Sequence, residues 1–115
     1  MAEQYHEPAE WLDEDTRDTT RIIKSIMEEF EAVDWYNQRM SATSDESLYA
    51  ILKHNRDEEL EHAAMGIEWL RRKIPEFDDE LKEILFKDGP ITGDHGDDEE
   101  GGSPSKGLNI GKMKG

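Results

Sequence analysis

The sequence predicts an all-α protein, built as an antiparallel two-helix hairpin with a short third helix, that dimerises into a four-helix bundle. Two long segments lack glycine or proline for most of their length and repeat apolar residues at spacings of three, four and seven, which is the period of an α-helix. With 115 residues the chain supplies only these two long helices. Because one hairpin cannot bury both apolar stripes, a second copy is expected to complete the bundle.

The first long helix is expected to begin at residue 8 or 13 and to end near residue 40. No glycine or proline occurs from Ala9 to Ser41, and Pro8 suits a first helical position. Acidic residues are dense from Glu10 to Asp18, as the positive end of a helix dipole favours. Residues 1–7 are interpreted as a flexible arm. The apolar stripe of this helix comprises Ile22, Ile26, Phe30, Val33 and Met40.

The second long helix is expected over about 45–72. Thr43 followed three residues later by Glu46 is typical of a capping box at a helix start. Pro75 prevents the helix from continuing, and a short third helix is expected over about 76–87. The helical domain would therefore span residues 8–88. The stripe of the second helix comprises Leu48, Leu52, Asn55, Glu59, Ala63, Gly66 and Leu70.

The C-terminal part of the chain changes composition. Residues 89–105 are rich in glycine and acidic residues, which predicts a flexible linker with too little apolar surface to fold. Residues 106–115 are basic and carry three apolar side chains, Leu108, Ile110 and Met113. We interpret this end as a peptide that docks into a groove of a partner. The alternative is a solvated tail whose apolar residues are incidental.

Charge and composition exclude several classes of function. The net charge of −15, from 29 acidic and 14 basic residues, argues against nucleic acids and anionic membranes as partners. The absence of cysteine excludes disulfides and thiolate metal sites. No apolar run approaches the roughly 18 residues of a membrane span, and the N-terminus lacks the features of a signal peptide. These observations predict a cytoplasmic protein.

Acidic residues inside both apolar stripes indicate a metal site. Glu29 lies within the first stripe, and Glu59 lies within the second with His62 at its edge. A carboxylate on a buried face is costly unless it is paired or binds a metal. The spacing Glu59-x-x-His62 places a carboxylate and an imidazole one helical turn apart, as in dinuclear metal sites of helix bundles. Pairing of these carboxylates with Arg56 or Arg39 is the alternative.

A dimer would complete this site. Two copies of Glu29, Glu59 and His62 supply four carboxylates and two imidazoles, a mixed oxygen and nitrogen ligand set that suits iron or manganese. Glu28, Glu31 and Trp35 lie on the opposite side of the first helix, either as a solvated acidic face or as a weak surface site for cations. His54 is either a surface histidine or a residue that supports the metal site or a channel.

Three segments, Met27–Tyr36, His54–Met65 and Glu68–Arg72, resemble the encapsulated ferritins, which are ferritin-like proteins carried inside encapsulin nanocompartments. The end of the chain, Leu108–Gly115, is similar to the peptides that bind the inner wall of the encapsulin shell. This resemblance implies that each subunit is half of a ferritin-like four-helix bundle. It also implies that dimers assemble into a decameric ring, located in the cytoplasm inside an encapsulin nanocompartment.

The resemblance further implies a ferroxidase that oxidises Fe(II) to Fe(III), with two iron ions per dimer, and that stores iron as cargo of the shell. The catalytic residues that it implies are Glu29, Glu59, His62 and Tyr36, of which the first three bind the metal. A secondary surface site through which iron enters would comprise Glu28, Glu31 and Trp35. Residues 106–115 would bind the encapsulin shell protein.

Two other functions remain open from the sequence. One is a non-catalytic acidic helical protein that binds metal or acts as an adaptor, with its acidic residues merely solvated. The other is a hemerythrin-like oxygen carrier. His6 and His95 lie in the predicted flexible ends, so only His54 and His62 remain in the helical domain. A hemerythrin-like site needs more imidazoles than these two.

Overall fold

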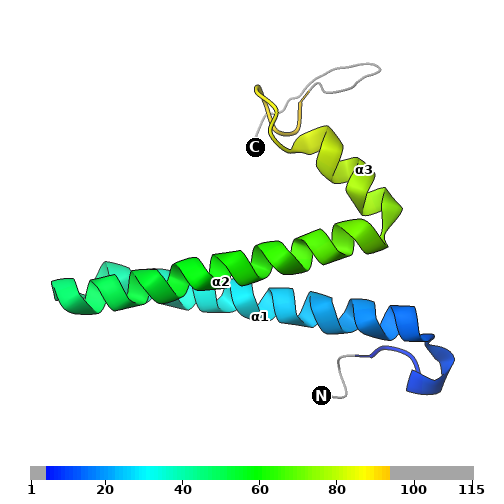
Figure 1. The fold of residues 1–115 in the computed structure, drawn as a ribbon, viewed down its shortest axis with the longest axis horizontal. Coiled ribbons are helices and arrows are strands. Elements are labelled where there is room, and N and C mark those ends of the chain that lie inside the picture. The colour runs from blue at the N-terminus through cyan, green and yellow to red at the C-terminus, as the bar shows by residue number, and fades with distance from the viewer. Residues whose placement is uncertain (1–4, 94–115) are drawn as a thin grey trace. The chain divides into compact units, whose positions relative to one another are not determined.

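A computed structural model of the chain describes residues 5–93, and these residues are helical with no strand among them (Figure 1). The three α-helices are α1 (Glu14–Ala42), α2 (Glu46–Lys73) and α3 (Pro75–Ile84), preceded by a short 3-10 turn, η2 (Ala9–Trp11). The predicted all-α fold is confirmed. Residues 1–4 of the predicted arm, residues 94–105 of the predicted linker and the predicted docking peptide 106–115 lie outside the described residues.

Two compact units divide the chain, the first ending at Lys73 and the second beginning at Ile74. In the first unit, α1 and α2 lie side by side and run in opposite directions, as Figure 1 shows. A contact between Lys73 Nζ and Asp15 Oδ1 at 3.3 Å ties the end of α2 to the start of α1. The antiparallel hairpin expected from the two apolar stripes is therefore present.

The start of α1 resolves the choice between residues 8 and 13. Pro8 precedes the turn η2, and the backbone is extended at Leu12 and Asp13 before α1 begins. The Asp13 carboxylate accepts a hydrogen bond from the backbone N–H of Thr16 at 2.8 Å. Because this bond satisfies one of the free N–H groups of the first turn, Asp13 is the cap that sets where α1 begins.

The turn between α1 and α2 differs from the predicted capping box. The Asp45 carboxylate, rather than the Thr43 hydroxyl, accepts the backbone N–H of Leu48 at 2.9 Å. The Thr43 hydroxyl instead accepts the N–H of Asp45 at 3.1 Å and so shapes the turn itself. The capping box of Thr43 and Glu46 was therefore wrong by register: α2 begins at Glu46, so residue 45 occupies the capping position.

The core of the hairpin is thin. Its buried residues are Met40 on α1 and Leu52, Ala63 and Gly66 on α2. Phe30 was predicted within the buried stripe, yet it is 46% exposed, because the contact between the two helices is too narrow to cover the whole stripe. The large apolar residues that remain exposed in this unit are Trp11, Ile23, Met27, Phe30, Trp35, Leu48, Tyr49, Ile51, Leu60, Met65 and Trp69. So much exposed apolar surface on one hairpin is typical of a protein that associates with a partner.

The second unit begins with α3. Pro75 stands at its first position, where the missing N–H of proline costs nothing. The helix was expected to reach residue 87 but ends at Ile84, because Leu85 is extended and Phe86 has a positive φ of 60°. Among the described residues, no helix is both long and apolar enough to cross a membrane.

Candidate metal centre

The hairpin brings Glu29 of α1 together with Glu59 and His62 of α2. His62 Nδ1 lies 3.5 Å from Glu29 Oε1 and 3.5 Å from Glu59 Oε1. One ligand atom from each of the three side chains lies within 4.8 Å of the others, which is close enough for one cation to contact all three. The two glutamates reach the same level because α1 continues to Ala42 before the turn.

Electrostatics in this cluster favour a bound cation. The side chains of Glu29 and Glu59 are only 27% and 24% exposed. A hydrogen bond with Glu59, partial burial and the negative charge of Glu59 raise the pKa of Glu29. Partial burial lowers the pKa of His62, but the charges and hydrogen bonds of Glu29 and Glu59 outweigh it and raise that pKa overall. A metal ion placed between the two carboxylates would relieve the repulsion that raises the pKa of Glu29, and it would compete with the proton of His62.

The donor set fits iron or manganese. Two carboxylates and one imidazole are hard and intermediate ligands, and a site without thiolates does not favour soft metals. Three donors from one chain also leave coordination positions free for further ligands. The motif Glu59-x-x-His62 and its partner Glu29 thus form a candidate site for one cation.

A groove of about 330 Å³ adjoins the cluster. Beyond Glu29 and His62, it is lined by Ile22, Ser25, Ile26, Met65, Gly66 and Trp69. The sequence analysis did not single out Ser25, Met65 or Trp69 for this role. The available signal was the spacing of His62, Met65 and Trp69 by three and then four residues, which puts these side chains on one side of α2.

The other predicted site residues are not gathered at this cluster. Tyr36 is half-buried on α1 and lies under the Arg39 guanidinium, 5.4 Å from the ring centre. Glu28, Glu31 and Trp35 are exposed. Within the described residues, a group of three or more ligands close enough to hold a metal forms from Glu29, Glu59 and His62. In residues 5–93, Glu28 and Glu31 are therefore not part of such a group.

Arg56 and His54 of α2 have partners outside the cluster of Glu29, Glu59 and His62. Arg56 donates to Asp57 at 2.8 Å and to the Asn37 side chain at 2.7 Å. The first of these bonds stays on α2, and the second joins α2 to α1. His54 Nε2 lies 3.2 Å from Glu58 Oε2 on the exposed surface of α2, with 71% of the His54 side chain exposed.

Comparison with known proteins places this chain in a family. The sequence model of the EncFtn-like family matches residues 4–88. The chain belongs to the EncFtn-like family. A ferritin-like protein of Thermotoga maritima is 50% identical over 114 residues and is matched along 99% of each chain. An encapsulated ferritin-like protein of Rhodospirillum rubrum is 49% identical, with 96% of this chain and 87% of that protein covered.

Two further comparisons agree with this assignment. The encapsulin nanocompartment cargo protein EncC of Myxococcus xanthus is 38% identical over 78 residues, which cover 68% of this chain and 60% of that protein. A crystal structure of a protein from Nitrosomonas europaea has 58% sequence identity and a TM-score of 0.73, and the match covers 76% of this chain and 97% of that one. The EncFtn-like hairpin of this chain is therefore shared by a solved structure.

Proposed function

We propose that two copies of this chain form a ferroxidase, which oxidises Fe(II) to Fe(III) at a di-iron centre between the subunits and serves as iron-storage cargo of an encapsulin shell. The observation that carries this proposal is the convergence of Glu29, Glu59 and His62 within 4.8 Å. It is supported by membership of the EncFtn-like family. The activity and the two-subunit site go beyond what the family assignment states.

The site needs a second subunit because one chain supplies too few ligands for two ions. In a two-fold dimer, the Glu59 and His62 pair of each subunit would hold one iron, and the two Glu29 carboxylates would bridge the ions. The exposed Met65 and Trp69 beside the cluster support pairing through this side of the hairpin, because a partner would cover their apolar surface. Other exposed apolar residues, such as Ile23 and Phe30, remain for contacts between dimers, in keeping with a decameric ring.

The redox chemistry belongs to the iron substrate, and the protein supplies geometry and charge. Each of two Fe(II) ions loses one electron, and one dioxygen molecule accepts both electrons together with two protons. The balanced products are two Fe(III) ions and one molecule of hydrogen peroxide. Glu29 and Glu59 compensate the charge of the ions, and the His62 imidazole must give up its proton to bind. Tyr36, two turns after Glu29 on the same side of α1, is proposed to act beside the centre.

Iron supply and storage complete the proposal. The net charge of −15 attracts Fe(II), and Glu28, Glu31 and Trp35 are proposed as a surface site through which iron enters. Two relatives are named as encapsulated or as nanocompartment cargo, which supports a role for this chain as encapsulin cargo. Residues 106–115 are proposed to bind the shell.

The ferroxidase proposal is tested by adding Fe(II) anaerobically, then admitting oxygen and following the absorbance of Fe(III). The wild type is expected to oxidise Fe(II) well above the protein-free rate, and Glu29→Ala is expected to lose most of this gain. Glu61→Ala is the matched control, because Glu61 is an exposed carboxylate of α2 that precedes His62 in the sequence and does not belong to the cluster. Equal rates for the wild type and Glu29→Ala would reject the ferroxidase and favour a non-catalytic metal-binding or adaptor protein.

Assembly and docking are tested separately. Analytical ultracentrifugation of metal-free protein with and without Fe(II) should show a shift to larger species, since metal shared by two chains favours the dimer. An unchanged size distribution would count against metal-driven assembly.

Deletion of residues 106–115 should abolish loading into a co-expressed encapsulin shell, and undiminished loading would refute the docking role.

A further inference from the structure

Gly66 allows the two helices of the hairpin to approach more closely than a side chain at this position would permit. It is buried on α2 against α1. A Cβ atom at this position would lie 2.6 Å from Ile26 Cγ1, 3.1 Å from Ile26 Cδ1 and 3.5 Å from Ile22 Cγ1. Because non-bonded carbon atoms normally stay about 3.5–4.0 Å apart, the first of these contacts is too short by roughly 1 Å.

Ile26 cannot easily move aside to make room. Its Cγ1 is attached directly to Cβ, so it is not the free end of a flexible side chain. Isoleucine is also β-branched, and in a helix one χ1 rotamer is strongly preferred. A side chain at position 66 would therefore push α1 and α2 apart at this level rather than displace Ile26 alone.

This contact adjoins the metal ligands. Ile26 is three residues before Glu29 on α1, and Gly66 is four residues after His62 on α2. Since the helices are antiparallel, both offsets point in the same direction along the hairpin. With a rise of about 1.5 Å per residue, the contact lies roughly one helical turn from the Glu29 and His62 pair. A change in helix separation there would extend to the ligands.

We propose that Gly66 is a positioning residue of the metal centre, whose missing side chain sets the helix separation at which Glu29 meets Glu59 and His62. This inference rests on the proposed function of the same cluster. Ligand sets must be held within about 0.5 Å of the productive geometry. A side chain at position 66 that moved the helices apart by roughly 1 Å would exceed this tolerance. We therefore expect metal affinity to fall on the order of tenfold.

The test measures Co²⁺ binding to the full-length protein by its visible absorption, because Co²⁺ reports coordination geometry without being oxidised by air during the titration. Gly66→Ala is expected to weaken Co²⁺ binding about tenfold and to change the absorption bands. The double variant Gly66→Ala/Ile26→Ala removes the clashing Cγ1 and is expected to restore most of the affinity. The matched control is Ala64→Gly at an exposed position of α2, which weakens the helix by about 1 kcal/mol without adding an atom.

Each result has a defined meaning. Wild-type affinity and spectrum in Gly66→Ala would overturn the inference while leaving the metal site intact. A loss in Ala64→Gly equal to that in Gly66→Ala would also overturn it, since a change near the ligands on α2 would then weaken binding without an added atom between the helices. If Gly66→Ala does not fold, the double variant decides, with near wild-type affinity in support and weak binding against. If Glu29→Ala bound Co²⁺ as tightly as the wild type, this result would instead reject the proposed site itself.

Discussion

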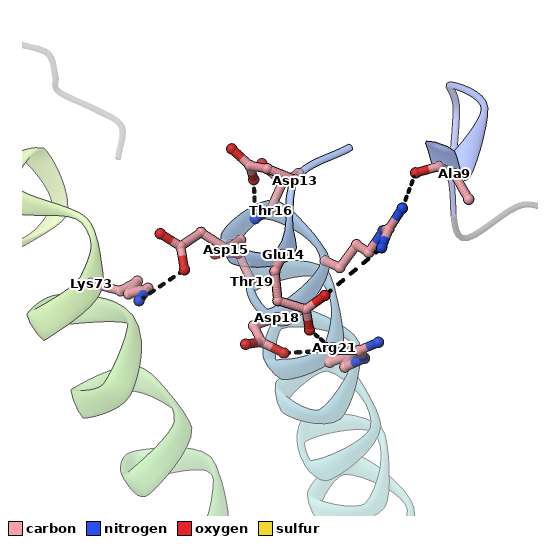
Figure 2. A network of polar contacts seen from close by, with 10 residues as sticks. Ala9, Asp13, Glu14, Asp15, Thr16, Asp18, Thr19, Arg21 and Lys73 are labelled. Carbon is pink, nitrogen blue, oxygen red and sulfur yellow. Dashed lines mark hydrogen bonds and ion pairs between the residues drawn. The ribbon is translucent and has the colours of Figure 1, made fainter. Parts of the chain in front are cut away.

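The acidic residues in the middle of the hairpin differ from those at its open end, which is the end where α1 begins and α2 finishes. At the open end, carboxylates face basic groups, as the network in Figure 2 shows: Arg21 donates to Glu14 and Asp18, and Lys73 contacts Asp15. Glu68, near the end of α2, receives hydrogen bonds from Arg71 at 2.8 Å and from Arg72 at 2.7 Å. In the middle, by contrast, two carboxylates face each other and share one imidazole.

The pKa values record this difference in direction. Hydrogen bonds from Arg71 and then Arg72 lower the pKa of Glu68 to about 2. The neighbouring Glu59 raises the pKa of Glu29 above its ordinary value. Both groups belong to the same acidic hairpin, so the immediate partner rather than the net charge decides the outcome. Carboxylates with internal partners hold the fold, whereas those that repel each other are available to an external cation.

The largest difference between the two regions should appear in iron oxidation. Glu59→Gln keeps the size of the side chain but removes a charged ligand, so the rate of Fe(II) oxidation above the protein-free background should fall on the order of a hundredfold. Glu68→Gln should leave this rate within about twofold, because Glu68 lies outside the cluster. Stopped-flow absorbance after oxygen addition measures both. A comparable loss in the two variants would show that the arginine-paired carboxylate and the clustered carboxylate do not differ in function.

The second difference concerns the stability of the metal-free protein, where the two regions should respond with opposite signs. A raised pKa means that the folded protein disfavours ionised Glu29, so Glu29→Gln should raise the melting temperature by a few degrees. A lowered pKa means that the fold favours ionised Glu68, so Glu68→Gln should lower it. Calorimetry in the presence of a chelator measures both shifts. A fall in the melting temperature of both variants would contradict the proposed repulsion in the cluster.

The third difference is the pH range in which the Glu68 carboxylate, paired with its two arginines, contributes to the stability of the fold. The pKa of Glu68 falls from an ordinary value of 4.5 to about 2 on folding. Its contribution is therefore fully present above about pH 4.5 and is lost as the pH falls towards 2. Glu68→Gln should flatten the decline of the melting temperature between these two pH values. Parallel curves for the wild type and the variant would show that the arginine pairs contribute nothing in solution.

Much of this architecture could be predicted because it depends on local sequence. Helical periodicity located α1 and α2 to within a few residues, and acidic residues inside the apolar stripes indicated Glu29 and Glu59. The exposed position of Phe30 could not be predicted from spacing, because a stripe of helical period does not say how wide the contact with α2 is. The cap at Asp45 lies two positions after the predicted cap at Thr43, and only the geometry of the turn decides between them.

The closeness of the helices at Gly66 was beyond sequence reasoning for a different reason. A glycine within a helical stripe is compatible with a close contact or with a simple loss of helix propensity. Only the positions of Ile22 and Ile26 on the other helix distinguish these alternatives. The pairing of Asp15 with Lys73, 58 positions apart in the chain, is of the same kind, because it requires the relative stagger of the two helices.

The smallest effect is expected from this last pair. The side chains of Lys73 and Asp15 are 38% and 75% exposed, so water and salt screen their attraction. Asp15→Asn should cost about 0.2–1 kcal/mol of the free energy of unfolding at low salt, and the cost should shrink when the salt concentration is raised. Lys73 also lies over the Trp69 ring at 5.6 Å, so Lys73→Met should cost more than Asp15→Asn and retain part of its cost in salt. Urea titrations at two salt concentrations measure both. Equal and salt-independent costs would mean that the contact between the helix ends acts through packing rather than charge, unlike the other ion pairs of the open end.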